Sequence, residues 1–183
     1  MKIQYRSVDL RARETGEPAE EKWFDFVATI AGAIAAVMLI LVFLFRVVTV
    51  DGQSMVPNLH HGDRLILTDV TTRYKQGEIV VISRADDDPL VKLVIAVGGD
   101  TIDLRDGNVY VNGLLLDEPY IDQETFDYSP GPPDFPLTVP HGYVFVMGDN
   151  RGNSQDSRAY EVGLIDTHRI LGKMLVHLTH AEE

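Results

Sequence analysis

The segment Asp51–Leu59 contains a serine, Ser54, in a setting that suits a nucleophile. Gly52 allows close backbone approach and Pro57 stiffens the chain, so the turn would hold an exposed hydroxyl rigidly. A serine of this kind can attack a carbonyl when a base accepts its proton. Taken alone, however, the pattern favours an ordinary turn serine over a catalytic one.

A single lysine, Lys92, interrupts the apolar run Leu90–Val97. A charged lysine costs several kcal/mol to bury, so Lys92 either extends its amine to solvent or is kept neutral in a pocket. A neutral amine is a competent base for a serine hydroxyl.

The segment Gly148–Arg158 is dense in polar residues and directly follows the apolar run Tyr143–Met147. It is either a solvated loop or a scaffold. In the second case Ser154 could orient the lysine, while Asp156 and Arg158 pair and brace the turn.

The six histidines form no metal-binding motif such as His-Glu-x-x-His. They are His60, His61, His141, His168, His177 and His180. An exposed pair without function is favoured for His60 and His61, beside a predicted turn at Gly62-Asp63. Spacing does not decide for or against a Ser-His-Asp triad, because triads are assembled in space, but no histidine is favoured.

The amino-acid composition and charge argue against cysteine chemistry and nucleic-acid binding. The absence of cysteine excludes disulfides, a thiol nucleophile and cysteine-based zinc sites. Residues 1–50 hold six basic and six acidic groups, so the net charge of −12 lies entirely on residues 51–183. Such a surface would be repelled by phosphate backbones, so nucleic-acid binding is not expected.

The run Phe26–Phe45 has twenty residues without a charge, a proline or an amide. A helix of that length covers about 30 Å, the thickness of a bilayer core. The run is longer than the apolar part of a cleaved signal, and no small-x-small cleavage site follows it. Basic residues gather before it, which predicts a cytoplasmic tail (1–25), a transmembrane anchor (26–45) and an extracytoplasmic domain (46–183).

Beyond the anchor, short Val/Ile/Leu-rich runs bounded by turn residues predict strands. They are Arg64–Thr68, Glu78–Ser83, Leu90–Val97, Thr101–Leu104, Asn108–Val111, Tyr143–Met147 and Leu171–Leu178. Asp106-Gly107 and Asn112-Gly113 predict tight hairpin turns. The proline- and acid-rich stretch Asp117–Pro140 is expected to be a surface excursion. The predicted fold class is therefore mostly β, with one N-terminal transmembrane helix.

The chain resembles the bacterial type I signal peptidases, membrane-bound serine proteases that remove signal peptides from exported proteins. The resemblance runs from the anchor to about Lys173. It is carried by Gly52-Gln-Ser-Met-Val-Pro-Asn-Leu59, by Lys92 in its strand followed by Gly99-Asp100, and by Gly148-Asp-Asn-Arg-x-x-Ser-x-Asp-Ser-Arg158. The third block is very specific and the first moderately so.

The resemblance implies a Ser-Lys dyad, with Ser54 as nucleophile and Lys92 as general base. It also implies that Ser154 orients Lys92, with Asp156 and Arg158 as structural support. The implied reaction is acyl transfer, in which backbone N–H groups around Ser54 stabilise the oxyanion and neither metal nor cofactor is needed.

The family fold implied is an antiparallel β unit with an exposed apolar surface near the bilayer. Its shallow pockets admit small residues, typically alanine, at the first and third positions before the cut. The positions that match the pocket walls are Val48, Val50, Met55, Leu59, Val81 and Val91. Some members carry a hydroxyl donor two residues before the nucleophile. Here that residue is Gly52, so a donor from this position must be backbone. The implied partners are signal peptides of secreted preproteins and the lipid bilayer.

Three positions depart from the family pattern: Asn58 replaces the usual threonine, Gly98 a proline, and Leu93 the arginine that usually follows the lysine. They suggest a divergent paralogue with a narrower set of clients. In the family that arginine commonly pairs with the aspartate equivalent to Asp149. We therefore expect Asp149 to turn to Arg151 or another base, or to be hydrated at the surface.

Two alternatives have other functions. A non-catalytic or narrowly dedicated relative could assist pilus or surface-protein assembly, but non-catalytic forms lose the serine or the lysine, and both are present here. A self-cleaving repressor also uses a Ser-Lys dyad, but the N-terminal span, in place of a DNA-binding domain, argues against it.

Overall fold

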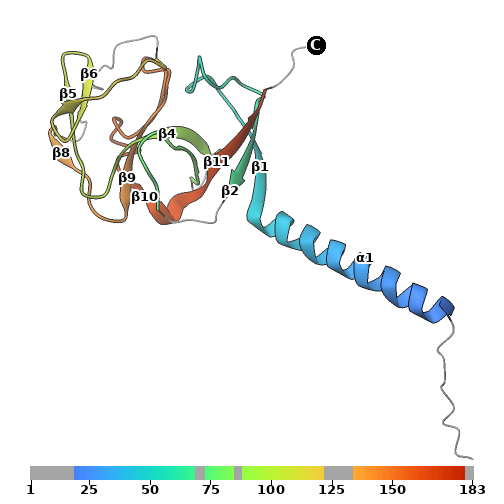
Figure 1. Ribbon diagram of the computed structural model, residues 1–183. Coiled ribbons are helices and arrows are strands. Elements are labelled where there is room, and N and C mark those ends of the chain that lie inside the picture. The colour runs from blue at the N-terminus through green and yellow to red at the C-terminus, as the bar shows by residue number, and fades with distance from the viewer. Residues whose placement is uncertain (1–18, 69–72, 85–87, 122–133, 180–183) are drawn as a thin grey trace, which may run out of the picture. The chain divides into compact units, whose positions relative to one another are not determined.

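A computed structural model of the chain describes residues 19–68, 73–84, 88–121 and 134–179 (Figure 1). These residues form one long helix, eleven strands and one short 3-10 helix. The elements are α1 (Ala19–Leu44), β1 (Phe45–Thr49), β2 (Arg64–Thr68), β3 (Ile79–Ile82), β4 (Leu90–Val97), β5 (Thr101–Arg105), β6 (Asn108–Val111), β7 (Leu114–Leu115), β8 (Leu137–Thr138), β9 (Tyr143–Met147), β10 (Ile165–Asp166), η1 (Thr167–Arg169) and β11 (Ile170–Leu178).

Helix α1 is long and apolar enough to cross a bilayer over Trp23–Leu44. It begins before the predicted anchor and ends one residue earlier, at Leu44. Phe45 already belongs to β1, because the β-branched residues that follow it favour an extended chain. The predicted cytoplasmic tail falls largely on residues 1–18, which lie outside the described residues.

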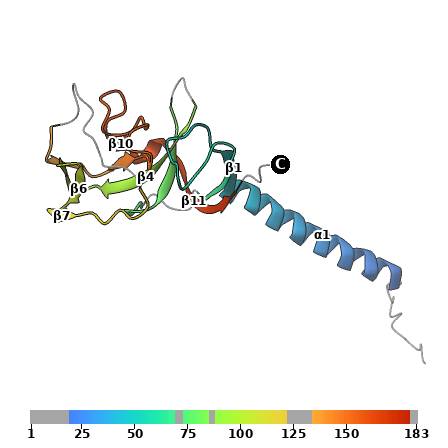
Figure 2. The same cartoon turned by 90° about the horizontal axis from the view of Figure 1, so that it is seen from above.

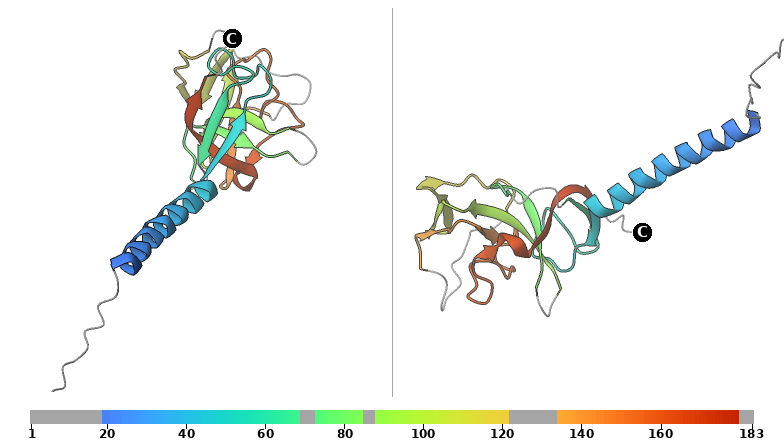
Figure 3. Two further views of the ribbon diagram at one scale, coloured as in Figure 1. Left: turned by 90° about the vertical axis from the view of Figure 1, so that its right-hand side faces the viewer. Right: turned by 90° about the horizontal axis from the view of Figure 1, so that it is seen from below.

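The chain divides into two compact units, Met1–Leu41 and Val42–Glu183. The second contains a seven-stranded sheet in the order β1-β2-β11-β3-β4-β9-β10 and a four-stranded sheet in the order β7-β6-β5-β8. Figure 2 labels β6 and β7 at one end of this unit, and Figure 3 shows β1 and β11 on either side of β2.

The small sheet is built by the two predicted tight turns. Asp106 and Asn112 have φ values of 50° and 53°, and the glycine after each also has a positive φ, as type I′ turns require. The turns join β5 to β6 and β6 to β7 with antiparallel registers Arg105↔Asn108 and Val111↔Leu114.

Strand β4 is the central element of the large sheet. It pairs with β3 on one side and β9 on the other, and Val91–Ala96 are all buried. Apolar side chains from β4 contribute to two core clusters, one with β2, β3, β9 and the 50–59 segment, the other with β3, β9 and β11. Any side chain in the middle of β4 is therefore held on a strand that is buried on both faces.

The described chain is mostly β, its strands pair antiparallel, and one apolar helix precedes them, as the sequence predicts. All seven predicted strands are present within one or two residues at each end. Four strands were not predicted: β1, which continues the apolar run of the helix, and β7, β8 and β10, which have two residues each.

Candidate active site

The turn that carries Ser54 lies in a loop closed at its base by backbone hydrogen bonds. The Val50 N–H donates to the Asp63 carbonyl at 2.7 Å, and the Gly62 N–H to the Val50 carbonyl at 2.9 Å. The side chains of Met55 and Leu59 are 1% and 2% exposed and anchor the loop in the core.

Gly52 has a φ of +90°, a conformation that favours glycine over other residues. Its backbone N–H donates to Nδ1 of His61 at 3.3 Å, so the predicted backbone donor at this position already has a partner. The backbone N–H of Ser54, by contrast, donates to no acceptor among the described residues. It is the more suitable oxyanion donor.

Lys92 lies in the middle of β4, opposite Val80 of β3, and is only 1% exposed. Its Nζ is 2.6 Å from Ser54 Oγ. A protonated amine donates to Oγ at this distance, whereas a neutral amine can accept the hydroxyl proton. The alternative in which Lys92 extends to solvent is therefore excluded.

Burial lowers the pKa of Lys92 from 10.5 to about 8. The negative charges of Asp156 and Asp149 oppose this change, and the positive charge of Arg84 supports it. Burial dominates because taking the ammonium out of water disfavours the charged form. A lysine with this pKa is partly neutral near physiological pH, as a general base must be.

The segment 148–158 forms a buried scaffold beside the pair. Asp156 and Arg158 are both 0% exposed, and Arg158 Nε lies 2.8 Å from Asp156 Oδ1. Arg158 also donates to the Arg151 carbonyl at 2.9 Å, and the Gly148 N–H donates to Asp156 Oδ2 at 2.9 Å. The segment is therefore not a solvated loop.

Ser154 is buried in this scaffold but does not hydrogen-bond Lys92. Its Oγ has no hydrogen-bond partner among the described residues. Gly148 packs so closely that a Cβ there would overlap both Ser154 Oγ and the Ser54 carbonyl oxygen. The structure thus places Ser154 next to the turn that carries Ser54, while its role in orienting Lys92 stays a prediction.

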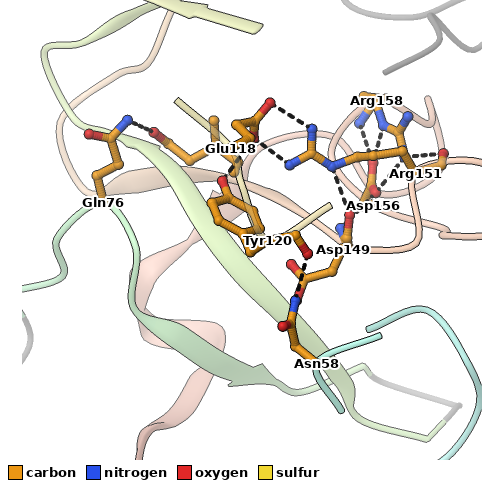
Figure 4. A network of polar contacts seen from close by, with 10 residues as sticks. Asn58, Gln76, Glu118, Tyr120, Asp149, Arg151, Asp156 and Arg158 are labelled. Atoms are coloured by element: carbon orange, nitrogen blue, oxygen red, sulfur yellow. Dashed lines mark hydrogen bonds and ion pairs between the residues drawn. The ribbon is translucent and has the colours of Figure 1, made fainter. Parts of the chain in front are cut away.

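Asp149 is 3% exposed, and its Oδ2 accepts a hydrogen bond from Asn58 Nδ2 at 2.8 Å (Figure 4). Both expectations for this residue are wrong, since it is neither hydrated at the surface nor bound to Arg151. Burial raises the pKa of Asp149, an effect that the Asn58 hydrogen bond opposes. The partner could not be identified from sequence because the two residues are 91 positions apart.

Arg151 pairs instead with Glu118, from the stretch expected to be a surface excursion. Both guanidinium ends bind the carboxylate, at 3.1 and 2.5 Å, and the Glu118 side chain is only 8% exposed (Figure 4). The Tyr120 hydroxyl donates to the same carboxylate at 2.8 Å. The start of the excursion is therefore part of the site, while residues 122–133 lie outside the described residues. No sequence signal pointed to Glu118 or Tyr120.

The six predicted pocket residues gather in one apolar cluster near the Ser54 turn. Five are buried and Val48 is half-buried: Val48, Val50, Met55, Leu59, Val81 and Val91. Contact of these side chains with a substrate stays a prediction.

The histidines do not join the Ser54–Lys92 pair among the described residues. His61 lies 3.1 Å from Asp51, and His177 lies 2.8 Å from the buried Asp63. No group of three metal-ligating side chains occurs in the described ranges. The geometry is that of a serine hydroxyl within hydrogen-bonding distance of a buried lysine amine.

Comparison with known proteins assigns the chain to a family. The family described as "Signal peptidase, peptidase S26" matches residues 23–179. Signal peptidase I of Bacillus licheniformis is 40% identical over 165 residues, which cover 81% of this chain and 84% of that protein. Signal peptidase IB of Staphylococcus aureus (strain Mu50) is 32% identical over 171 residues, covering 85% and 88%.

A crystal structure of a signal peptidase I from Enterococcus faecalis V583 is 28% identical, with a TM-score of 0.47, and covers 55% of this chain and 96% of that one. On the family match and the sequence relatives, this chain belongs to the signal peptidase family, whose members cleave signal peptides. It is an enzyme, a hydrolase of the serine protease class.

Proposed function

We propose that this enzyme is a membrane-bound serine endopeptidase that removes N-terminal signal peptides from exported preproteins by a Ser54–Lys92 dyad. The observation that carries the proposal is the 2.6 Å contact between Ser54 Oγ and an amine that is 1% exposed. Burying a lysine beside a serine hydroxyl does not help the protein to fold, because the amine is costly to desolvate. The same lysine is useful as the base in an acyl-transfer reaction.

In the proposed mechanism, neutral Lys92 takes the proton of Ser54 as its oxygen attacks the scissile carbonyl. The Ser54 backbone N–H stabilises the oxyanion of the tetrahedral intermediate. The Lys92 ammonium then protonates the departing amine, which leaves an acyl-enzyme. Lys92, neutral again, accepts a proton from the water molecule that attacks the ester, and it returns this proton to Ser54 Oγ as the ester bond breaks, which releases the acid product and restores the free enzyme.

The proposed specificity is for small residues, typically alanine, at the first and third positions before the cut. It rests on the apolar cluster around Ser54, in which Met55 and Val81 are almost fully buried. Close packing of this kind leaves room for a methyl group more readily than for a large side chain.

The proposed location is a cell membrane, crossed once by α1, with the N-terminus in the cytoplasm and the β unit outside. Support comes from the apolar segment Trp23–Leu44 and the basic residues before it in the sequence. A preprotein that emerges through the same membrane would then meet the active site on the outer side.

The test is to incubate membranes that hold this protein with a labelled preprotein, next to membranes that hold Ser54→Ala, Lys92→Ala or the double variant. Each change should abolish cleavage, and the double variant should be no worse than either single one, because the two residues act as a unit. A preprotein with alanine at the first position before the cut should be processed, and one with leucine there should not. Substantial turnover by Lys92→Ala would refute the dyad, and efficient cleavage after leucine would refute the specificity.

A further inference from the structure

Asn58 joins three separate parts of the chain through one side chain. It lies four residues after Ser54, and its Nδ2 donates to Asp149 Oδ2 at 2.8 Å and to the Tyr120 carbonyl at 2.9 Å. A primary amide has two N–H donors, so both are used, each on a different segment. A serine or threonine hydroxyl has one donor and could satisfy only one of these acceptors.

Asn58 is rigidly connected to the nucleophile. Its own N–H donates to the Met55 carbonyl at 3.0 Å, and the next N–H, that of Leu59, donates to the same carbonyl at 2.8 Å. Met55 directly follows Ser54 and is 1% exposed. A displacement of Asn58 would therefore be passed to Ser54 through a short, hydrogen-bonded turn.

The partner loop also contacts the nucleophile's backbone. The Asn150 N–H donates to the Ser54 carbonyl at 3.0 Å, and its side chain to the Gln53 carbonyl at 3.1 Å. The Ser54 turn is thus tied to the 148–158 segment at two places, by Asn150 at the serine and by Asn58 beyond it. Two attachments determine the orientation of a turn, whereas one leaves it free to pivot.

Asn58 is the one hydrogen-bond donor to the Asp149 side chain among the described residues. Asp149 Oδ1 is buried without a partner there, and Arg151 is engaged by Glu118 (Figure 4). Loss of the Asn58 amide would leave a buried carboxylate without any described donor. The segment would have to shift to bring water or another group to it.

We propose that Asn58 is a positioning residue, which holds Ser54 at the Lys92 amine by binding Asp149 and the Tyr120 carbonyl at the same time. The inference rests on the proposed Ser54–Lys92 dyad. Asn58 touches neither Oγ nor Nζ, so it acts through the turn. Its removal should lower the rate of the chemical step more than the affinity for substrate.

The test uses the full chain in detergent and two readouts. One is acylation of Ser54 by a small activated ester, p-nitrophenyl acetate, followed by mass spectrometry. The other is kcat and KM for cleavage of a labelled preprotein. Asn58→Asp keeps the shape but removes the donors, and it should lower both acylation and kcat by roughly 10- to 100-fold with little change in KM. Asn153→Asp is the matched control, because Asn153 is exposed in the partner loop and makes no side-chain hydrogen bond among the described residues. It should change neither rate.

The exchanged pair Asn58→Asp with Asp149→Asn provides the decisive variant. The amide introduced at position 149 can donate to the carboxylate introduced at position 58, which restores this hydrogen bond with reversed polarity. The exchanged pair should be about tenfold more active than Asn58→Asp alone, since the bond to the Tyr120 carbonyl is not restored. Circular dichroism of each variant, recorded beside the rates, separates a lower rate in a folded protein from a loss of fold.

The proposal is overturned if Asn58→Asp reacts as fast as the unchanged protein, or if the exchanged pair is no more active than Asn58→Asp. Failure of the proposed function has a different signature. The unchanged protein would then be acylated at Ser54 without cleaving preproteins, and acylation would still measure the effect of Asn58. Should Asn58→Asp not fold, the exchanged pair still decides, because it has to recover both fold and acylation.

Discussion

Lys92 is the residue whose chemistry depends most on where the fold places it. In water its amine would be protonated at any physiological pH, but a position 1% exposed lowers its pKa to about 8. Strand β4 enforces this position, because Val91–Ala96 are all buried and both faces of the sheet are therefore covered around Lys92. Burial removes water from the Lys92 ammonium and thereby increases the fraction of lysine that is neutral.

The first prediction is that kcat/KM for preprotein cleavage rises with pH with a midpoint near 8. The neutral amine is the active form, and its population increases as pH passes through the pKa of Lys92 in the free enzyme. Initial rates at low substrate concentration between pH 6 and about 10 measure it. A midpoint near 6.5 would instead indicate a histidine base.

The second prediction concerns Asp149, whose burial raises its pKa. A raised carboxyl pKa means that the folded protein holds the proton longer than the unfolded chain, so this group's contribution to stability falls as pH rises above about 3.9. Asp149→Asn keeps an acceptor for Asn58 and removes the buried charge. We expect this variant to be more stable than the unchanged protein at pH 7, by about 1 kcal/mol.

Chemical denaturation of both proteins at about pH 3 and about pH 7 measures this difference. The advantage of Asp149→Asn should be larger at the higher pH, because at the lower pH the carboxyl is mostly protonated in both the folded and the unfolded chain. If Asp149→Asn is instead less stable at both pH values, then the charge of Asp149 is compensated in the folded protein and this account of its burial is wrong.

At the scale of elements, the 148–158 segment works as a rigid body rather than as a loop. Arg158 and Asp156 are fully buried, and the pair connects to the Gly148 N–H and the Arg151 carbonyl. Every described charged group in this segment is therefore placed by hydrogen bonds. This rigidity suits an element that must keep Ser54 and Lys92 in contact.

The third prediction is that Arg158→Met lowers the free energy of unfolding by about 3–5 kcal/mol, because Asp156 would remain buried without its cation. Arg105→Met is the control. Arg105 pairs with Asp103 at 2.9 Å, but its side chain is 53% exposed, so this change should cost about 1 kcal/mol or less. Urea denaturation followed by far-UV circular dichroism gives the free energy of unfolding of each variant. If both variants lost the same free energy of unfolding, the buried Arg158–Asp156 pair would contribute no more to stability than the exposed Arg105–Asp103 pair.

At the scale of the whole molecule, the apolar helix and the β unit have different properties. The segment Trp23–Leu44 suits a bilayer by length and composition. The β unit holds the Ser54–Lys92 pair and the whole net charge of −12 falls beyond residue 50. A strongly acidic unit of this kind has little attraction for an anionic membrane surface, so attachment would rest on the helix.

The fourth prediction is that protease added to intact spheroplasts digests the β unit and spares a tag at the N-terminus. Under the positive-inside rule, the basic residues before the apolar segment should retain the N-terminus in the cytoplasm. Immunoblots for the tag and for the β unit, with and without detergent, measure both sides. Protection of the β unit until detergent is added would reverse the proposed orientation.

Sequence patterns alone predicted the local features of this protein. The alternation and turn chemistry around Asn108–Val111 specify a hairpin strand, because Asn-Gly and Asp-Gly favour the positive φ values that tight turns need. The helix follows from an uninterrupted apolar run. Lys92 stood out because a lysine is unusual within an apolar run, whereas the roles of Ser54, Asp156 and Arg158 were implied by the resemblance to the type I signal peptidases.

The tertiary structure decided how distant segments meet. The partner of Asp149 is Asn58, and that of Arg151 is Glu118, a residue in a stretch with no pattern of its own. Hydrogen bonds between such residues depend on the distances and directions that the packed sheet imposes, and neither leaves a periodic trace along the chain. Even the 2.6 Å contact of Lys92 with Ser54 requires both the sheet that buries the lysine and the loop that brings the serine to it.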